Sequence, residues 1–269
     1  MLGLCARASW PRLADLTRMW DSLTELVTRC DLPRGGSAGT LLHTLQAATV
    51  SARGHLRRST TMTTDALQRN ISFLRAQLQS WPLPDLFPRL ARLLVAVGEP
   101  VTVHQVATAG GWTQEQVQAA LARHPRVDFD EDGRIAGFGL TLHPTPHSFS
   151  FDGHTVYGFC ASDALEFAVI LDRPGRIEST CPATGQPIRV EVTPSEVLTV
   201  DPPDAVVSTV RPTQAVTDIR AYCDLCNFFS SPDAATDWLA QNPQGQIATV
   251  ADDFAITRQT IIEVGWVTP

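Results

Sequence analysis

Residues 101–139 read VTVHQVATAGGWTQEQVQAALARHPRVDFDEDGRIAGFG and combine two helix signals with a hairpin signal. A short helix is expected through Val106, and a Gly-Gly pair ends it. Thr113, followed by Gln116 three positions later, has the spacing of a capping box and predicts the start of a second helix. The last residues alternate and turn at DEDG (130–133), which predicts a β-hairpin. Helix, turn, helix and hairpin in this order indicate a winged-helix unit.

Two longer helices are expected before this unit. The segments DALQRNISFLRAQLQSW (65–81) and PDLFPRLARLLVAVG (84–98) place apolar residues at spacings of three and four, and Pro and Gly mark their ends. With the unit that follows, they predict a winged-helix-like domain over residues 65–139.

The sequence becomes rich in strand-like segments after Gly139. Segments such as GLTLHPTPHSFSFDG, GRIESTCPATGQPIRVEVTP and AVVSTV alternate in polarity and are separated by Gly and Pro turns. One helix is expected near residues 161–171 and others after Pro232. The predicted fold class is therefore α+β, with an antiparallel-sheet domain and flanking helices over residues 140–269.

Residues 1–64 are predicted to be a leader that is flexible or partly helical. The segment WPRLADLTRMWDSLTELVTRC could form an amphipathic helix, whereas DLPRGGSAGT and SARGHLRRSTTMTT are polar and basic. Residues 1–61 hold 8 Arg and 4 acidic residues, a net charge of +4, and this composition weakly matches a transit segment. The alternative is that Met62 is the true start of the protein.

Composition excludes several classes of protein. The chain has 269 residues, 43% of them hydrophobic, so it can bury a substantial core. No run reaches the ~18 to 20 apolar residues of a membrane helix. The net charge of −7 argues against a general nucleic-acid binder, because such proteins neutralise phosphates. Six Cys are too few for a disulfide scaffold and no signal peptide is recognisable, so we expect a cytoplasmic protein with reduced thiols.

The predicted winged helix raises the question of DNA binding. Its second helix, TQEQVQAALARH, contains one Arg, one Glu and several Gln, and the tip of its wing, DFDEDGR, is strongly acidic. Phosphates would be repelled there. A structural or interaction role is therefore the favoured interpretation of this unit.

Four cysteines fall in the second predicted domain: Cys160, Cys181, Cys223 and Cys226. If a helix begins near Ala161, Cys160 lies at its N-terminus, where the helix dipole favours a thiolate. Asp163 then lies one turn along the same face. The surrounding run VYGFCASDALEFAVIL (156–171) is apolar, which tends to keep a carboxyl group protonated near neutral pH.

Other interpretations of these residues stay open on spacing alone. Cys160 could be a small core residue, and Asp163 could cap the helix. The CDLC sequence at 223–226 fits half a zinc site, a redox pair or coincidence, and Cys181 could be a buried turn residue. Soft-metal chemistry, a structural zinc site and no metal role all remain possible.

Several segments together resemble a known family. GFGLTLHPTPHSFSFDGHTVYGFCASDALEFAVIL, ESTCPATGQPIRVEV, VVSTVRP and DIRAYCDLCNFFSS are similar in order and separation to organomercurial (alkylmercury) lyases. The resemblance spans about residues 65–260. It implies that Cys160 and Cys223 bind mercury, that Asp163 is the acid and a further ligand of the Hg(II) product, and that Cys181 is structural. The chain departs from the pattern at Asp224, where family members often have a second cysteine, and Cys226 is therefore a further candidate metal ligand.

The resemblance implies an enzyme of mercuric resistance and detoxification. Two thiolates coordinate the mercury of an organomercurial, and Asp163 protonates the organic carbon, which gives a hydrocarbon and Hg(II). No cofactor is required; Hg(II) is bound as substrate and product. The expected partners are organomercurial small molecules, with small thiols or mercuric reductase as the Hg(II) acceptor, and neither nucleic acid nor membrane. The alternatives are a metal-responsive winged-helix DNA-binding regulator and a structural-zinc protein.

Overall fold

The structure is a computed structural model and describes residues 62–124, 127–210 and 219–267. Residues 59–269 form one compact unit. The predicted leader, with its possible helix and with Cys5 and Cys30, lies outside the described residues except for residues 62–64. Across the described ranges, each helix falls short of the length and apolar character that a membrane span requires.

The two helices expected before the winged helix are present as α3 (Thr64–Gln79) and α4 (Leu86–Val97). Thr63 caps α3 by accepting a hydrogen bond from the backbone N–H of Ala66. Helix α4 ends at Gly98, whose positive φ of 75° is readily adopted by glycine. Both predictions from apolar spacing are confirmed.

The winged-helix prediction is also confirmed. Helices α5 (Val103–Gly110) and α6 (Gln114–Leu121) are followed by the hairpin of β1 (Asp128–Phe129) and β2 (Ile135–Phe138). The capping box of Thr113 and Gln116 is formed. The turn of the hairpin closes on Asp130, whose carboxylate accepts hydrogen bonds from the backbone of Asp132 and Arg134.

The hairpin is part of a larger antiparallel sheet of eight strands, in the order β1-β2-β3-β5-β4-β6-β7-β8. Its other strands are β3 (Leu140–Thr141), β4 (His147–Phe151), β5 (His154–Gly158), β6 (Gly175–Thr180), β7 (Pro187–Val192) and β8 (Val197–Asp201). The pairing of β2 with β3 carries the sheet across Gly139. The division of the chain at residues 139 and 140 therefore falls within a continuous sheet, and it stays a prediction.

A second sheet of three antiparallel strands lies nearer the C-terminus. It consists of β10 (Phe228–Phe229), β9 (Val206–Val210) and β11 (Gly245–Thr249), in that order. Helices α8 (Ile219–Cys223), α9 (Thr236–Gln241) and α10 (Val250–Glu263) belong to the same part of the chain. Helices after Pro232 were expected and are found, so the α+β fold class is confirmed.

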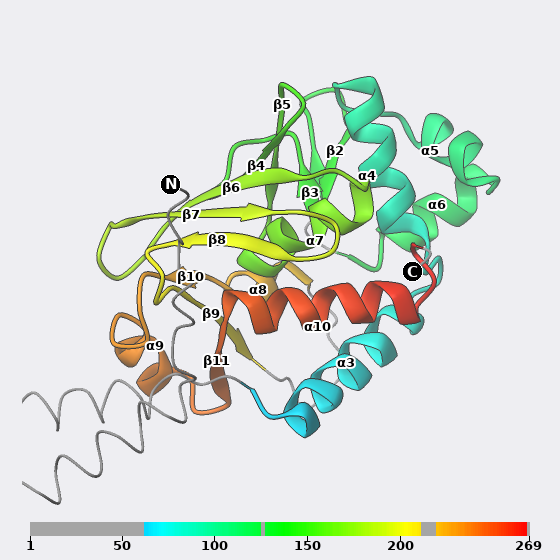
Figure 1. The fold of residues 1–269 in the computed structure, drawn as a ribbon. Coiled ribbons are helices and arrows are strands. Elements are labelled where there is room, and N and C mark those ends of the chain that lie inside the picture. The colour runs from blue at the N-terminus through cyan, green and yellow to red at the C-terminus, as the bar shows by residue number, and fades with distance from the viewer. Residues whose placement is uncertain (1–61, 125–126, 211–218, 268–269) are drawn as a thin grey trace, which may run out of the picture. The chain divides into compact units, whose positions relative to one another are not determined.

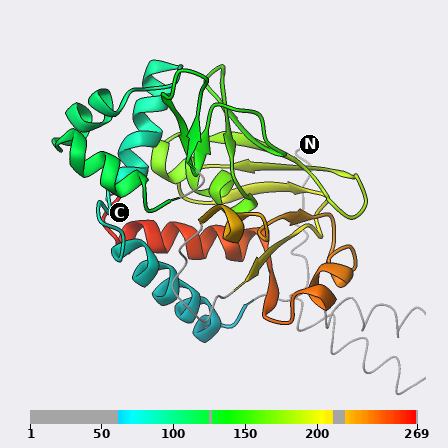
Figure 2. The same ribbon diagram turned by 180° about the vertical axis from the view of Figure 1, so that it is seen from behind.

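Helix α7 (Ala161–Leu171) lies at the centre of the unit. It packs against β3, β4, β5 and β6 on one side and against α10 on the other. Helix α3 runs alongside α10 in both views of the ribbon (Figure 1, Figure 2). Phe149, Leu165 and Phe167 are fully buried between these layers, and each such side chain contributes roughly 1.5 to 3 kcal/mol through burial. The first turn of α7 is therefore held in a closely packed frame.

Candidate active site

Cys160 is the N-cap residue of α7. Strand β5 leads into it, and the backbone N–H of Phe159 donates to the carbonyl of Gly139, 3.0 Å away. The sulfur of Cys160 accepts from the backbone N–H of Asp163 at 3.4 Å, while Asp163 Oδ2 accepts from the backbone N–H of Cys160 at 3.1 Å. This is a capping box in which cysteine takes the place usually held by Ser or Thr. The predicted helix start and the shared face of Cys160 and Asp163 are confirmed.

Cys223 comes to this helix start from a distant part of the chain. It is the last residue of α8, and its sulfur donates a hydrogen bond to Asp163 Oδ2 over 3.8 Å. One ligand atom from each of Cys160, Asp163 and Cys223 lies within 4.8 Å of the other two. The structure thus brings together the three residues selected from the sequence, and their separation suits joint contact with one large ion.

The thiols at this site differ in one respect from the sequence-based expectation. Burial, followed by a hydrogen bond to Cys223, raises the pKa of Cys160 well above its usual value. A hydrogen bond from Cys160 acts to lower the pKa of Cys223, but burial and neighbouring acidic groups outweigh it and raise that pKa to about 12. The expectation that the helix N-terminus favours a thiolate is therefore wrong, because desolvation outweighs the helix dipole.

The carboxyl group of Asp163 behaves as expected from its apolar setting. Burial raises its pKa to about 6, although hydrogen bonds from Cys160, Cys223 and the backbone of Phe159 act in the opposite direction. A group with a pKa near 6 can both accept and donate a proton near neutral pH.

Cys226 lies beside the cluster of Cys160, Asp163 and Cys223, although it is not one of the three residues that meet within 4.8 Å. Its backbone carbonyl accepts a hydrogen bond from the N–H of Ala161 at 3.1 Å, and interaction with the Cys160 thiol, followed by burial, raises the pKa of its own thiol well above the usual value. Its sulfur is 3.1 Å from the hydroxyl oxygen of Ser162, which in turn donates to Asp253 Oδ2 at 2.7 Å.

The other two positions singled out in the sequence lie elsewhere. Cys181 is buried at the turn between β6 and β7, where its backbone N–H donates to the carbonyl of Gln186 at 2.9 Å. The interpretation of Cys181 as a buried turn residue is confirmed. Asp224 is exposed and forms an ion pair with Arg220 at 3.5 Å.

Sequence reasoning missed three polar neighbours of the cluster: Glu166, Tyr222 and Asp253. All three line the same cavity as Cys160, Asp163 and Cys223. Glu166 follows Asp163 by three positions in a predicted helix, so the spacing already placed it on that face. No local pattern marks Asp253, which reaches the site from α10 only through the packing of that helix against α7.

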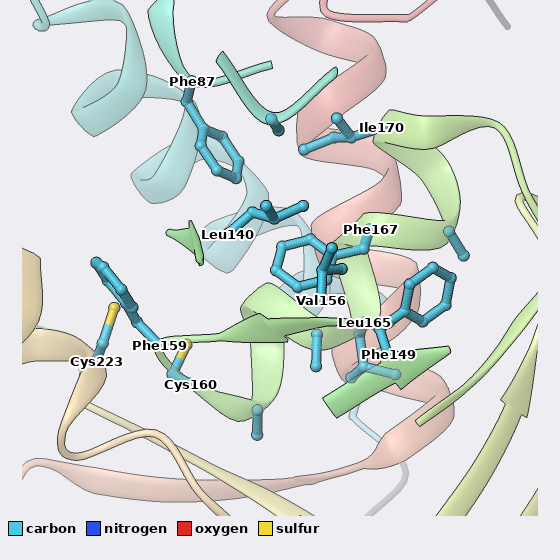
Figure 3. Close-up of a cluster of buried hydrophobic side chains, with 14 of the residues drawn as sticks. Phe87, Leu140, Phe149, Val156, Phe159, Cys160, Leu165, Phe167, Ile170 and Cys223 are labelled. Carbon is cyan, nitrogen blue, oxygen red and sulfur yellow. The ribbon is translucent and has the colours of Figure 1, made fainter. Parts of the chain in front are cut away.

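The cavity beside the cluster has a volume of about 140 Å³. Its apolar wall comes mainly from α3, α4, β2 and the C-terminal residues, and includes Phe73, Leu78, Trp81, Phe87, Phe138 and Trp266. Figure 3 shows Cys160 and Cys223 at one edge of the hydrophobic cluster that contains Phe149, Leu165 and Phe167. The two thiols and one carboxyl group therefore face a mainly apolar space.

Two family profiles match the chain. The profile described as alkylmercury lyase matches residues 140–261, and the one described as the helix-turn-helix domain of alkylmercury lyase matches residues 79–139. Both profiles thus belong to one family of lyases, and the residues that they match include the two thiols and the acid of the cluster.

Individual relatives agree with this assignment. The chain is 46% identical to an alkylmercury lyase of Streptomyces lividans over 165 residues, which are 61% of this chain and 77% of the relative. It is 45% identical to the Bacillus cereus alkylmercury lyase over 173 residues, 64% of this chain and 79% of the relative. The crystal structure of the mercury-bound form of MerB2 superposes with a TM-score of 0.63 at 25% identity, covering 73% of this chain and 98% of that one. The chain belongs to the alkylmercury lyase family.

Proposed function

We propose that Cys160, Cys223 and Asp163 carry out the reaction of this lyase, the cleavage of the carbon–mercury bond of an organomercurial. Family membership supports the reaction, and the meeting of the three ligand atoms within 4.8 Å of one another supports the assignment of residues. Mercury(II) is a soft ion, and thiolates are the side chains that soft metals prefer. Mercury is the substrate and product here, and no organic cofactor takes part in the proposed chemistry.

The proton of Cys223 is already directed at Asp163 Oδ2. As mercury binds, each thiol exchanges its S–H bond for an S–Hg bond. One of the two protons passes to Asp163, and the other leaves with the ligand that mercury brought. The carbon–mercury bond then breaks, its electron pair takes the proton from Asp163, and the hydrocarbon is released. Two thiols and one organomercurial thus give a hydrocarbon, a protonated leaving ligand and Hg(II) held by two sulfurs.

The raised pKa values fit this order of events. Because the raised pKa values favour protonated thiols, mercury displaces their protons as it binds, and the carboxyl group beside them is placed to receive one. A positioned acid of this kind contributes typically 10²- to 10⁴-fold to the rate. Holding the carbon close to Asp163 contributes further.

The product Hg(II) is expected to pass to a small thiol or to mercuric reductase. The Cys226 sulfur lies 3.1 Å from the hydroxyl oxygen of Ser162, in the first turn of α7, and we expect it to join in this transfer. Nucleic acid is not a proposed partner: the wing tip carries Asp130, Glu131 and Asp132, and phosphates would be repelled there. The lyase is favoured over a metal-responsive regulator and over a structural-zinc protein because both family profiles are those of alkylmercury lyases.

The test compares Cys160→Ser and Cys223→Ser with Cys181→Ser, a matched exchange at the buried turn. Benzene release from phenylmercury is followed in excess thiol. Each of the first two variants should lose more than the roughly 10- to 100-fold that removal of an outer-shell partner costs at a metal site. Cys181→Ser should retain activity in proportion to its folded fraction, measured by circular dichroism. Near-normal turnover by folded Cys160→Ser would refute the assignment.

A further inference from the structure

The cavity beside the cluster is large enough for an aromatic ring. Its volume of about 140 Å³ is close to that of an engineered apolar cavity of about 150 Å³ that binds benzene in another protein. The side chains that line it on the apolar side are aromatic or aliphatic. The cavity is therefore of a size to hold an aryl group.

Helix α7 directs such a group toward Glu166. Cys160, Asp163 and Glu166 succeed one another at intervals of three residues, so they lie along one face of the helix, and all three line the cavity. The carbon bonded to mercury must lie near Asp163 to receive its proton. An organic group that extends from this carbon along α7 reaches the next turn, where Glu166 is located.

The electrostatic setting of Glu166 is unusual for a carboxyl group. Burial raises its pKa well above the usual value, and repulsion from Asp163 and Asp253 adds to this. None of the residues that the structure describes donates a hydrogen bond to its carboxyl group. Among the described residues lining the cavity, three are acidic and none is Arg, Lys or His. Arg220 stacks on Phe159, 4.1 Å from the ring centroid, and does not line the cavity.

We propose that Glu166 is a specificity-determining residue that selects organomercurials by the charge of the organic group, favouring cationic groups over neutral ones and neutral groups over anionic ones. The proposal rests on the assignment of Cys160, Cys223 and Asp163 made above. An ammonium group beside Glu166 would stabilise its ionised form against the burial that favours the neutral acid, and would form a charge-assisted hydrogen bond with it. A carboxylate in the same place would be buried beside three acidic residues, without a basic partner among the described lining residues.

The experiment uses three arylmercurials of matched size, with a methyl, an aminomethyl or a carboxyl group in the position para to mercury. Cleavage is followed by release of the corresponding arene, in excess of one thiol so that the leaving ligand is constant. The wild-type kcat/KM should be about 10- to 100-fold higher for the aminomethyl than for the methyl compound, the range expected of a hydrogen bond to a charged group. The carboxyl compound should be the poorest of the three.

The variants Glu166→Gln and Glu166→Leu should reduce the ratio of kcat/KM between the aminomethyl and methyl compounds to near one. Glu131→Gln is the control, because it makes the same side-chain exchange on the exposed wing. A wild-type preference for the carboxyl compound, or an unaltered ratio in either Glu166 variant, would overturn the proposal. Failure of the wild-type protein to cleave even phenylmercury would instead count against the assigned chemistry, so the two failures are distinguishable.

Discussion

Asp163→Asn separates the chemical role of this side chain from its structural role. The carboxyl group caps α7 by accepting the backbone N–H of Cys160 at 3.1 Å, and it is also the proposed acid. The amide oxygen of Asn can still accept that hydrogen bond, whereas Ala would remove it at a cost of about 0.5 to 2 kcal/mol. Asn, however, has no proton of comparable acidity to give to carbon.

The expected loss in the rate of carbon–mercury cleavage is therefore about 10²- to 10⁴-fold, or roughly 3 to 5.5 kcal/mol in activation free energy. The free energy of unfolding should change by less than about 1 kcal/mol, because the capping box survives. Rapid mixing of excess enzyme with phenylmercury measures benzene formed in a single turnover, and denaturant unfolding measures stability.

Binding of Hg(II) supplies the control, since both sulfurs remain in Asp163→Asn. The variant should still bind one equivalent of Hg(II). The reasoning would be refuted if Asp163→Asn kept more than a tenth of the wild-type single-turnover rate. Loss of both Hg(II) binding and stability would show instead that the side chain acts through the cap.

Three further changes test the surroundings of the cluster. Asp253→Asn should stabilise the protein against urea unfolding by about 1 to 3 kcal/mol at pH 8 and by little near pH 4. Burial raises the pKa of Asp253 from 3.8 to about 6. Ionisation of this carboxyl group therefore lowers the free energy of unfolding as the pH rises from 3.8 to about 6, and the whole loss is present above about pH 6. Equal effects at both pH values would contradict this. Gly158→Ala should destabilise the protein by about 1 to 3 kcal/mol in thermal unfolding, because the added Cβ would lie 2.8 Å from the carbonyl oxygen of Cys160. An unchanged melting temperature would disprove this close contact. Cys226→Ser should slow transfer of bound Hg(II) to a competing thiol more than it slows hydrocarbon release, because its sulfur lies beside the cluster, 3.1 Å from the hydroxyl oxygen of Ser162, but is not one of the three ligand atoms that meet. Abolished hydrocarbon release would instead identify Cys226 as the second mercury ligand.

Local sequence patterns predicted much of the fold. The apolar spacings of residues 65–81 and 84–98, and the capping box at Thr113, each gave a helix where the structure has one. These signals depend on interactions within a few residues, which is why they can be read from a single chain. Helix α8 was not predicted, because it has only five residues and shows no periodic spacing of apolar residues.

The sequence alone determined that Cys160 and Asp163 lie on one helix face in apolar surroundings, because the spacing of side chains along a helix is fixed by its geometry. Which second thiol meets them, Cys223 rather than Cys181, was decided by how α8 packs at the start of α7, and only the resemblance to a family suggested it beforehand. Tertiary structure also decided that burial raises the pKa of the Cys160 thiol and that Glu166 and Asp253 share the cavity. Desolvation and charge coupling depend on groups that are distant in sequence and near in space, so no local pattern could reveal them.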